Sequence, residues 1–377
     1  MKASTISLYL LPLVAAAAPP PPPPHSGTYK PIAPPKPPKP SPHPPKPPSN
    51  TSYPGLGALA SLAGIYFGTA IDNVVLNNTA YTTIAHNASE FNQVTPSNAQ
   101  KWMYTEPSRN VFTYTNASAI FNPARAAHQL RRCHTFVWHN QLPDWLTNGN
   151  WTAATLKPVL ENHIKNVARE FREDCFAWDV VNEAFEDDGS LRKSIWLEVL
   201  GKEYIEWAFV WARKYTEGKA KLYYNDYGIE RVNNKSLAVR EMVKDFLARD
   251  IPIDGVGLQS HFTVGRAPTY DEVTAALNLY TPYHPTIETA LTELDVRILL
   301  PSTPATRTLQ ANVYVNATRA CVEMASCVGV TVWDFWDPVS WVPESFPGYG
   351  EACLFDEGLG RKEAYFEVKE YLRGVGR

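Results

Sequence analysis

The stretch that decides the fold is WDVVNEAF, residues Trp178–Phe185, an apolar run that ends on an amide and an acid. Its valines and aromatic residues predict a buried β-strand. Burial of a carboxylate is costly unless the group is paired or hydrogen-bonded, so Asn182 and Glu183 need a reason to end such a strand. The same pattern recurs in ALTELDV, residues 290–296, where two acids interrupt a short apolar run. Both stretches therefore predict strands that open into a functional site.

Short β-like runs with helical stretches between them recur along most of the chain. Their starts are separated by about 30 to 45 residues, the length of a strand–helix unit with its loops. The eight candidate strands cover residues 64–71, 93–96, 134–139, 177–184, 221–227, 254–261, 290–296 and 329–335. Apolar residues at three- and four-residue steps predict intervening helices from Leu156 to Phe171 and from Tyr204 to Tyr215. The alternation predicts an α/β fold, a (β/α)8 TIM barrel, with a doubly wound sheet as the alternative.

Polar or ionisable side chains follow nearly every candidate strand. In a parallel barrel, the carboxyl ends of the strands line the active-site face. A single polar residue of this kind could be a satisfied core group or a helix cap, whereas six strands that end this way indicate a site. The residues are His134 with His139, Asn182 with Glu183, Asn225 with Asp226, Gln259 with His261, Glu293 with Asp295, and Trp333 with Asp334.

Two glutamates and several tryptophans at one barrel mouth indicate cleavage of a bond between sugars. The reaction needs one carboxylic acid that protonates the leaving oxygen and one carboxylate that attacks or activates water. Glu183 and Glu293 end the fourth and seventh candidate strands, so they can face each other across the mouth. The chain contains neither an HExxH motif nor a CxxC pair, so we expect neither a catalytic metal nor a cofactor.

Three segments of different composition follow one another along the chain. Residues 1–18 contain a lysine, a short apolar stretch and a run of small residues, which predicts a secretory signal peptide and not a membrane span. Residues 19–54 hold 18 of the 33 prolines and predict a disordered, extended linker. We expect residues 55–377 to form a single catalytic domain. The net charge of −3 and the lack of a dense Lys/Arg cluster there argue against nucleic acid as a partner.

We expect a secreted, extracellular monomer that has no membrane attachment. Seven sequons predict N-glycosylation, at Asn50, Asn77, Asn87, Asn116, Asn150, Asn234 and Asn316. Five cysteines permit two disulfides and one remaining thiol. Cys321 and Cys327 flank a short segment, and Cys133 and Cys175 precede two successive candidate strands. We expect these two pairs to form disulfides and Cys353 to be a buried, unreactive thiol.

Six motifs along the chain carry a resemblance to a known family. They are HTFVWHNQLPDWL (134–146), FAWDVVNEAFEDDGSLR (176–192), LYYNDY (222–227), PIDGVGLQSH (252–261), TELDVR (292–297) and CVGVTVWDFWDPVSW (327–341). In this order they resemble glycoside hydrolase family 10, the xylanases, over most of residues 64–372. The resemblance implies a secreted endo-1,4-β-xylanase (EC 3.2.1.8) on a (β/α)8 barrel. Such an enzyme hydrolyses internal β-1,4-xylosidic bonds of xylan, a plant cell-wall polysaccharide, with retained configuration. The WDFWDPVSW stretch is similar to the fungal members.

The matching positions imply roles for individual residues. Glu183 in VVNEA matches the general acid/base, and Glu293 in TELD matches the nucleophile. Asn182 matches the residue that binds the 2-hydroxyl of the attacked sugar. His261 matches the residue that is bonded to the nucleophile, with Asp295 behind it. Positions that contact the substrate in the family are matched by Asn98, Lys101, His134, Trp138, Gln141, Tyr227, Gln259, Trp333 and Trp341.

One departure concerns the ENxxKW motif of the family, which reads SNAQKW here. Ser97 offers one short hydroxyl where the family carries a carboxylate, which affects the second glycone subsite and not the chemistry. Two alternatives remain. One is a related retaining β-1,4-glycosidase that acts on glucan or on a glycosylated small molecule, which room beside C5 of the sugar would distinguish. The other is a non-catalytic polysaccharide-binding barrel, which would have lost a carboxylate.

Overall fold

The computed structural model describes residues 54–375 of the chain. The predicted signal peptide, residues 19–53 of the predicted linker and the sequon at Asn50 lie outside these residues. The predicted catalytic domain lies within them except for its last two residues.

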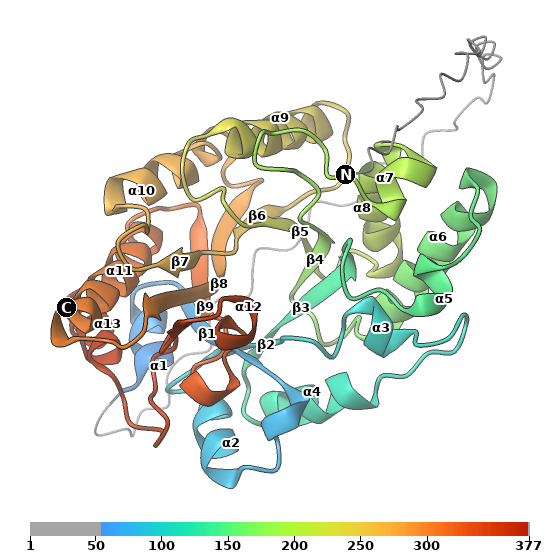
Figure 1. The fold of residues 1–377 in the computed structure, drawn as a ribbon. Helices are drawn as coiled ribbons and strands as arrows, with labels where there is room; N and C mark the ends of the chain where they lie inside the picture. Colours follow the sequence, from blue (N-terminus) through green and yellow to red (C-terminus); the bar gives the residue numbers. More distant parts are fainter. Residues whose placement is uncertain (1–53, 376–377) are drawn as a thin grey trace, which may run out of the picture. The chain divides into compact units, whose positions relative to one another are not determined.

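Eight parallel strands form a closed barrel (Figure 1). Most of them are rich in valine, tyrosine and other residues that suit a buried, pleated surface, and every barrel strand is buried along most of its length. Each barrel strand pairs with the next barrel strand along the chain. The last one, β9, pairs with both β8 and β1, which closes the ring. The barrel strands are β1 (Tyr66–Ile71), β2 (Gln93–Pro96), β3 (Leu130–Val137), β4 (Ala177–Asn182), β5 (Lys221–Asp226), β6 (Gly255–Leu258), β8 (Glu288–Leu299) and β9 (Cys327–Val332).

The predicted (β/α)8 barrel is confirmed, and the closed ring rules out the doubly wound sheet, which keeps two open edges. Several strand boundaries were wrong: the candidate strand 134–139 begins earlier, at Leu130, and the candidate strand 329–335 covers Cys327–Val332. Two further differences have a clear physical reason. The candidate strand 254–261 breaks after Leu258, where Ser260 adopts a φ of 68°, a left-handed conformation that cannot continue a strand. The candidate strand 290–296 extends to Leu299 because its end finds new partners outside the ring. These partners are the short strands β7 (His261–Thr263) and β10 (Tyr349–Gly350).

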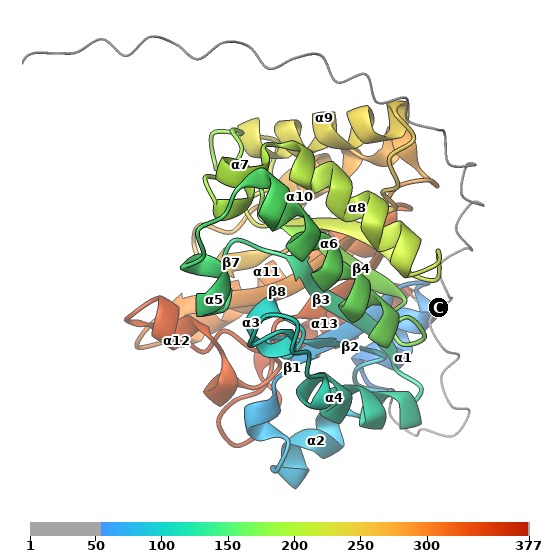
Figure 2. The same cartoon turned by 90° about the vertical axis from the view of Figure 1, so that its right-hand side faces the viewer.

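Helices cover the outside of the barrel (Figures 1 and 2). None of the helices within residues 54–375 combines the length and the apolar character needed to cross a bilayer. The helices are α1 (Leu56–Leu62), α2 (Thr79–Ala85), α3 (Trp102–Thr105), α4 (Thr115–Ala126), α5 (Asp144–Thr147), α6 (Ala153–Glu170), α7 (Ile195–Leu200), α8 (Glu203–Tyr215), α9 (Asn234–Ala248), α10 (Tyr270–Asn278), α11 (Pro304–Val322), α12 (Val342–Ser345) and α13 (Glu363–Val375).

The two helices predicted from apolar spacing are α6 and α8, which pack side by side (Figure 2). All the apolar positions that predicted α6 are buried, including Leu160 and Ile164. Burial of each such side chain stabilises the fold by about 1.5–3 kcal/mol. The amphipathic stripe of each helix therefore joins it to the barrel wall.

The structure contains both predicted disulfides. Cys133 of β3 is bonded to Cys175, which precedes β4, and Cys321 of α11 is bonded to Cys327 of β9. Cys353 is a free, buried thiol, as predicted, and burial raises its pKa well above the ordinary value. A thiol in this state is a poor nucleophile, because the thiolate is the reactive form.

The asparagines of the described sequons differ in exposure. Asn77, Asn87, Asn116, Asn150 and Asn234 are exposed. Asn316 is half-buried within α11, and Thr318 of the same sequon is fully buried. Glycosylation stays a prediction at all of these sites. Asn316 is the least accessible of the described sequon asparagines to a glycosylating enzyme.

A buried ion pair crosses the barrel interior between neighbouring strands. The Arg132 guanidinium on β3 donates hydrogen bonds to both carboxylate oxygens of Asp179 on β4. The two side chains are 1% and 0% exposed, so each charge has little water to solvate it. Such a pair is tolerated because its geometry is bidentate, and removal of one partner leaves a buried charge uncompensated.

We predict that Asp179→Asn lowers the free energy of unfolding by about 3–5 kcal/mol, because the Arg132 charge loses its partner. Urea unfolding followed by circular dichroism measures the change. The matched control is Asp245→Asn, which breaks the exposed pair with Arg249 and should cost at most about 0.5 kcal/mol. Equal effects of the two variants would contradict the prediction.

Candidate active site

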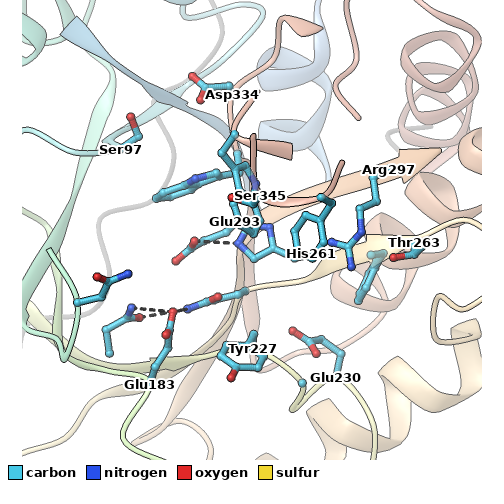
Figure 3. A pocket seen from close by; sticks show the side chains of 18 of the residues that line it. Ser97, Glu183, Tyr227, Glu230, His261, Thr263, Glu293, Arg297, Asp334 and Ser345 are labelled. Atoms are coloured by element: carbon cyan, nitrogen blue, oxygen red, sulfur yellow. Dashed lines mark hydrogen bonds and ion pairs between the residues drawn. The ribbon is translucent and has the colours of Figure 1, made fainter. Parts of the chain in front are cut away.

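A cavity of about 1210 Å³ opens at the carboxyl ends of the barrel strands. The predicted catalytic, supporting and substrate-binding residues all line it except Asp295, which is fully buried and bonded to His261. Figure 3 shows the Glu183 and Glu293 side chains reaching into this cavity from different strands, with His261 beside Glu293. The barrel therefore gathers residues that lie far apart in the chain.

Glu293 lies on β8, and both of its carboxylate oxygens have nitrogen partners. Asn225 of β5 donates from Nδ2 to Oε1 at 2.7 Å, and His261 Nε2 lies 3.1 Å from Oε2. The other ring nitrogen of His261, Nδ1, lies 2.8 Å from Asp295 Oδ2. Gly257 leaves room for the Asn225 side chain, since a Cβ at this glycine would lie 2.2 Å from Asn225 Oδ1. These contacts build the predicted string of carboxylate, histidine and carboxylate.

Charges within this string oppose the effect of burial. Burial alone would raise the pKa of Glu293. The pKa is instead lowered to about 2, by the hydrogen bond and charge of His261, by the charge of His134 and by the hydrogen bond from Asn225. Burial would lower the pKa of His261, whereas Asp295 and Glu293 raise it to about 10. At neutral pH the histidine is therefore cationic and Glu293 is ionised. An ionised carboxylate is the form able to attack a carbon atom.

Glu183 directly follows β4 and adopts a left-handed backbone with a φ of 57°. This conformation costs a non-glycine residue about 1–2 kcal/mol, so the surrounding contacts must hold it. Its backbone N–H donates to the Asn225 carbonyl at 2.9 Å. Trp138 Nε1 donates to Glu183 Oε2 at 2.9 Å, and Gln259 Nε2 donates to Oε1 at 2.9 Å. The strained turn and these donors together aim the carboxyl group into the cavity.

A chain of side-chain amides links the two glutamates. Asn182 Nδ2 lies 3.1 Å from Glu183 Oε1, and Asn182 Oδ1 accepts a bond from Asn225 Nδ2 at 2.9 Å. Asn225 Nδ2 also donates to Glu293, so both carboxyl groups belong to one network. Glu293 lies against a cationic histidine, whereas Glu183 is bonded to an indole and to amides. The two acids therefore occupy different electrostatic environments, as two different roles require.

A second polar string reaches Glu293 from within the barrel. His134 Nδ1 lies 2.9 Å from Asp179 Oδ2 and 4.0 Å from Glu293 Oε1. Asp179 in turn is held by Arg132. The Trp333 ring packs edge-on against His134, with 5.4 Å between the ring centroids. These contacts place His134 in the lining of the cavity, next to Glu293.

The cavity wall beside Ser97 carries a carboxylate that comes from another strand. Asp72 directly follows β1 and lines the cavity. Ser97 Oγ lies 3.0 Å from Asp72 Oδ2 and 3.2 Å from the Ile71 carbonyl, and Asn98 Nδ2 also donates to Asp72 Oδ2. The hydroxyl that replaces the family carboxylate is therefore engaged by a neighbouring acid.

Lys101 continues this polar wall toward the glutamates. Its Nζ donates to Asn98 Oδ1 at 2.9 Å and to Gln141 Oε1 at 2.6 Å, and it lies 4.8 Å from the centre of the Trp138 ring. Burial lowers the pKa of Lys101 to about 8, although Glu293 and Glu183 partly oppose this effect. The amine and the amides offer donors to sugar hydroxyls at one end of the cavity.

Aromatic side chains form other parts of the wall. Trp341 Nε1 donates to Asp295 Oδ2 at 2.7 Å, and its ring centroid lies 4.7 Å from that of His261. The Tyr227 hydroxyl accepts a bond from Arg192 at 2.7 Å, and Lys235 lies 3.5 Å from the centre of its ring. Each ring is thus fixed by a polar contact, and the wall combines apolar faces with a few oriented polar groups, as is typical of ligand sites.

Residues 55–371 match the family model described as glycosyl hydrolase family 10. The chain belongs to this family. It is 43% identical over 314 residues to endo-1,4-beta-xylanase D of Talaromyces funiculosus. That match covers 83% of this chain and 76% of the Talaromyces protein. It is also 43% identical over 332 residues to endo-1,4-beta-xylanase A of Humicola insolens. That match covers 86% of this chain and 88% of the Humicola protein.

The fold agrees with this family assignment. A crystal structure of a family 10 xylanase from Bispora sp. MEY-1 with xylobiose superimposes with a TM-score of 0.81 and 40% identity, over 84% of this chain and 99% of that one. The resemblance inferred from the six motifs is confirmed for the family and for the barrel.

Four of the polar residues selected at strand ends do not line the cavity: Asn225, Asp226, Asp295 and His139. Asn225 and Asp295 still support the site through their bonds to Glu293 and His261, whereas Asp226 and His139 do not. Asp226 points instead to Lys235, whose Nζ lies 2.8 Å from Oδ1, and burial raises the pKa of Asp226 to about 7 against the lysine charge. His139 lies beside Glu183, with 3.9 Å between Nδ1 and Oε2, and contributes to a smaller neighbouring pocket. A strand-end position alone does not say which way a side chain points.

The polar residues that line or support this site and that the sequence analysis missed include Asp72, Arg192, Lys235 and Arg297. Asp72 directly follows the candidate strand 64–71, so the strand-end rule could have found it. Arg192 and Lys235 contact Tyr227 from elsewhere in the chain, and no local pattern marks them. Arg297 closes the TELDVR motif, one residue beyond the predicted strand.

Within residues 54–375, no group of three or more His, Cys, Asp or Glu side chains is arranged to hold a metal ion.

We predict that His261→Asn moves the acidic limb of the pH profile of kcat/KM to higher pH. The cationic histidine is one of the groups that hold the pKa of Glu293 at about 2, so its loss raises that pKa and Glu293 becomes protonated at higher pH. Activity on a glycoside substrate is measured from pH 2 upward. The control is His86→Asn, since His86 contacts Gln129 and not the cavity, and its acidic limb should match the wild type. An unmoved limb in His261→Asn would refute the prediction.

Proposed function

We propose that this protein is a secreted endo-1,4-β-xylanase that hydrolyses internal β-1,4-xylosidic bonds of xylan with retention of configuration. The observation that carries the proposal is the placement of Glu183 and Glu293 in one hydrogen-bonded network at one cavity, in different electrostatic environments. The similarity to fungal proteins named endo-1,4-beta-xylanases supports xylan as the substrate.

In the first step, Glu293 attacks the anomeric carbon of the sugar as Glu183 gives its proton to the departing oxygen. The bond from that carbon to the leaving sugar breaks, and an ester forms between the sugar and a Glu293 oxygen. The cationic His261 keeps Glu293 ionised before the attack. The second hydrogen of Asn182 Nδ2 is available to the 2-hydroxyl, because the first is directed at Glu183.

In the second step, water replaces the departed sugar beside Glu183. Glu183, now a carboxylate, takes one proton from the water, whose oxygen attacks the anomeric carbon and displaces Glu293. The carbon has then been inverted twice, so the product keeps the β configuration. Both glutamates return to their starting protonation states, and no other reactant is consumed.

Export is the second part of the proposal. Residues 1–18 support it as a signal peptide, and the two disulfides of the structure are typical of proteins that mature in an oxidising compartment. The protein then acts as an extracellular monomer on plant cell-wall polysaccharide, without cofactor, nucleic acid or membrane partner.

We predict that the wild type releases reducing sugar from xylan at least about tenfold faster than from carboxymethyl-cellulose, because glucose carries a hydroxymethyl group that the site must accommodate. Glu293→Gln should lose at least about a thousandfold on xylan while its thermal unfolding stays unchanged. Comparable rates on the two polymers would favour the related β-1,4-glycosidase instead. Undiminished activity of Glu293→Gln would remove the mechanism, and no activity of the wild type would favour a polysaccharide-binding barrel.

A second prediction concerns stereochemistry. Proton NMR recorded during the first minutes of hydrolysis of a xylo-oligosaccharide should show the β anomer before mutarotation mixes the two forms, because the double displacement retains configuration. The control is the same substrate left to equilibrate without enzyme. Initial release of the α anomer would show a single displacement by water, and the ester between the sugar and Glu293 would then be excluded.

A further inference from the structure

The guanidinium of Arg297, for which the described part of the chain supplies no ion pair, lies in the wall of the active-site cavity. Arg297 is half-buried and lines the cavity. Its guanidinium carbon lies 3.8 Å from the centre of the Phe346 ring and 6.0 Å from that of Tyr349. Among the residues that the structure describes, no carboxylate lies within ion-pair distance of it. This cation has lost part of its water, and Asp295 acts on it only from beyond ion-pair distance, an arrangement that favours an anionic ligand.

The extension of β8 beyond the barrel puts this cation near the reacting groups. Glu293, Asp295 and Arg297 occupy every second position of β8, so their side chains lie on the same face of the strand. Such positions are about 6.6 Å apart along a strand. Arg297 pairs with Thr263 of β7 in the parallel ladder, so the two side chains share a face. Figure 3 shows Arg297 and Thr263 beyond His261, on the side away from Ser97. The cation therefore stands beside the site and not next to the Ser97 wall.

Other basic side chains near this wall differ in their pairing. Arg231 is paired with Glu272, and Lys235 is paired with Asp226. Arg266 lines the same cavity, is exposed and, within the described residues, has no ion pair. This part of the cavity thus has two guanidinium groups, those of Arg297 and Arg266, that are free to meet an anion.

Two acids near this wall have to be weighed against the cations. Glu230 is buried and accepts a hydrogen bond from the Ser260 N–H at 2.7 Å, and burial raises its pKa, which favours the neutral form. Glu344 is exposed on α12, lines the cavity and makes no ion pair with any described residue. Its negative charge at the same cavity opposes the binding of an anionic ligand, so it provides a competing carboxylate and a variant of opposite expected sign.

We propose that Arg297, together with Thr263 and Arg266, binds the carboxylate of an acidic side group of the polysaccharide, a hexuronic acid branch. The inference rests on the proposed function and names the substrate class for which this site is built. The main chain of xylan is neutral, so only a substituent can give the guanidinium an ionic partner. Phe346 holds the guanidinium by stacking and leaves the edge that carries its N–H donors available for a carboxylate.

The test compares two xylo-oligosaccharides of equal length, one linear and one with a glucuronic acid branch. Arg297→Met keeps most of the aliphatic contact with Phe346 but removes the charge and the donors. It should lower kcat/KM on the branched substrate about tenfold, the loss expected for one charge-assisted hydrogen bond, with the linear substrate unchanged. Rising ionic strength should weaken the preference of the wild type for the branched substrate and leave Arg297→Met unaffected.

Two further variants sharpen the comparison. Glu344→Gln removes the competing carboxylate and should raise kcat/KM on the branched substrate without a change on the linear one. Arg249→Met removes an arginine that is paired with Asp245 and Glu206 away from the cavity, and it should change neither. An equal loss on both substrates in Arg297→Met would overturn the proposal, because it would show that Arg297 only supports the loop that contains Phe346.

A binding measurement separates this proposal from the proposed function. Calorimetry compares the branched oligosaccharide bound to Glu293→Gln and to Glu293→Gln/Arg297→Met, neither of which needs to turn over. A Kd about tenfold weaker in the double variant, with equal Kd values for the linear sugar, supports the acidic subsite even if hydrolysis of xylan fails. Equal Kd values for the branched sugar overturn it, whatever the catalytic activity.

Discussion

The backbone hydrogen bonds that join β9 to both β8 and β1 are the interaction on which the rest of the structure depends. They close eight parallel strands into a ring, and a closed parallel ring brings every carboxyl end to the same mouth. Glu183 and Glu293 lie 110 positions apart in the sequence, yet a network of three side-chain bonds connects them. An open sheet would spread the same strand ends along an edge and would give no enclosed cavity.

The closed ring leaves little water in the barrel interior, so each charged side chain there needs a partner of opposite charge or a hydrogen-bond donor. The barrel interior contains Asp179, Glu293 and Asp295, and each has a basic or imidazole partner. These partners do more than offset the cost of burial. His261 separates the two carboxylates of its string and holds Glu293 in its ionised form, while Glu183 is held by uncharged donors in a strained turn. The same requirement that stabilises the barrel thus assigns different chemistry to its two acids.

The cavity is not uniform along its wall. Beside Ser97, carboxylate and amide groups from β1 and its neighbours, with the amine of Lys101, form a polar surface suited to neutral sugar hydroxyls. Beyond His261, the extension of β8 adds the Arg297 guanidinium, which packs on Phe346 and makes no ion pair within residues 54–375. A polymer that lies across the mouth meets both surfaces at once. The proposed binding of an acidic branch therefore involves a part of the wall that is distinct from the two glutamates.

The sequence by itself determined the fold class, the two catalytic candidates, both disulfide pairs and the family, because these depend on local patterns: strand periodicity, motif order and cysteine spacing. Local patterns also located Asn182 and Gln259 at strand ends, although they marked Asp226 as well, which turns away to Lys235. Only the tertiary structure decided that Asp72 meets Ser97 and that Arg297 packs on Phe346 without an ion pair to any described residue. The physical reason is that the direction of a side chain and the charge around it depend on strands brought together by barrel closure, which no local stretch of sequence records.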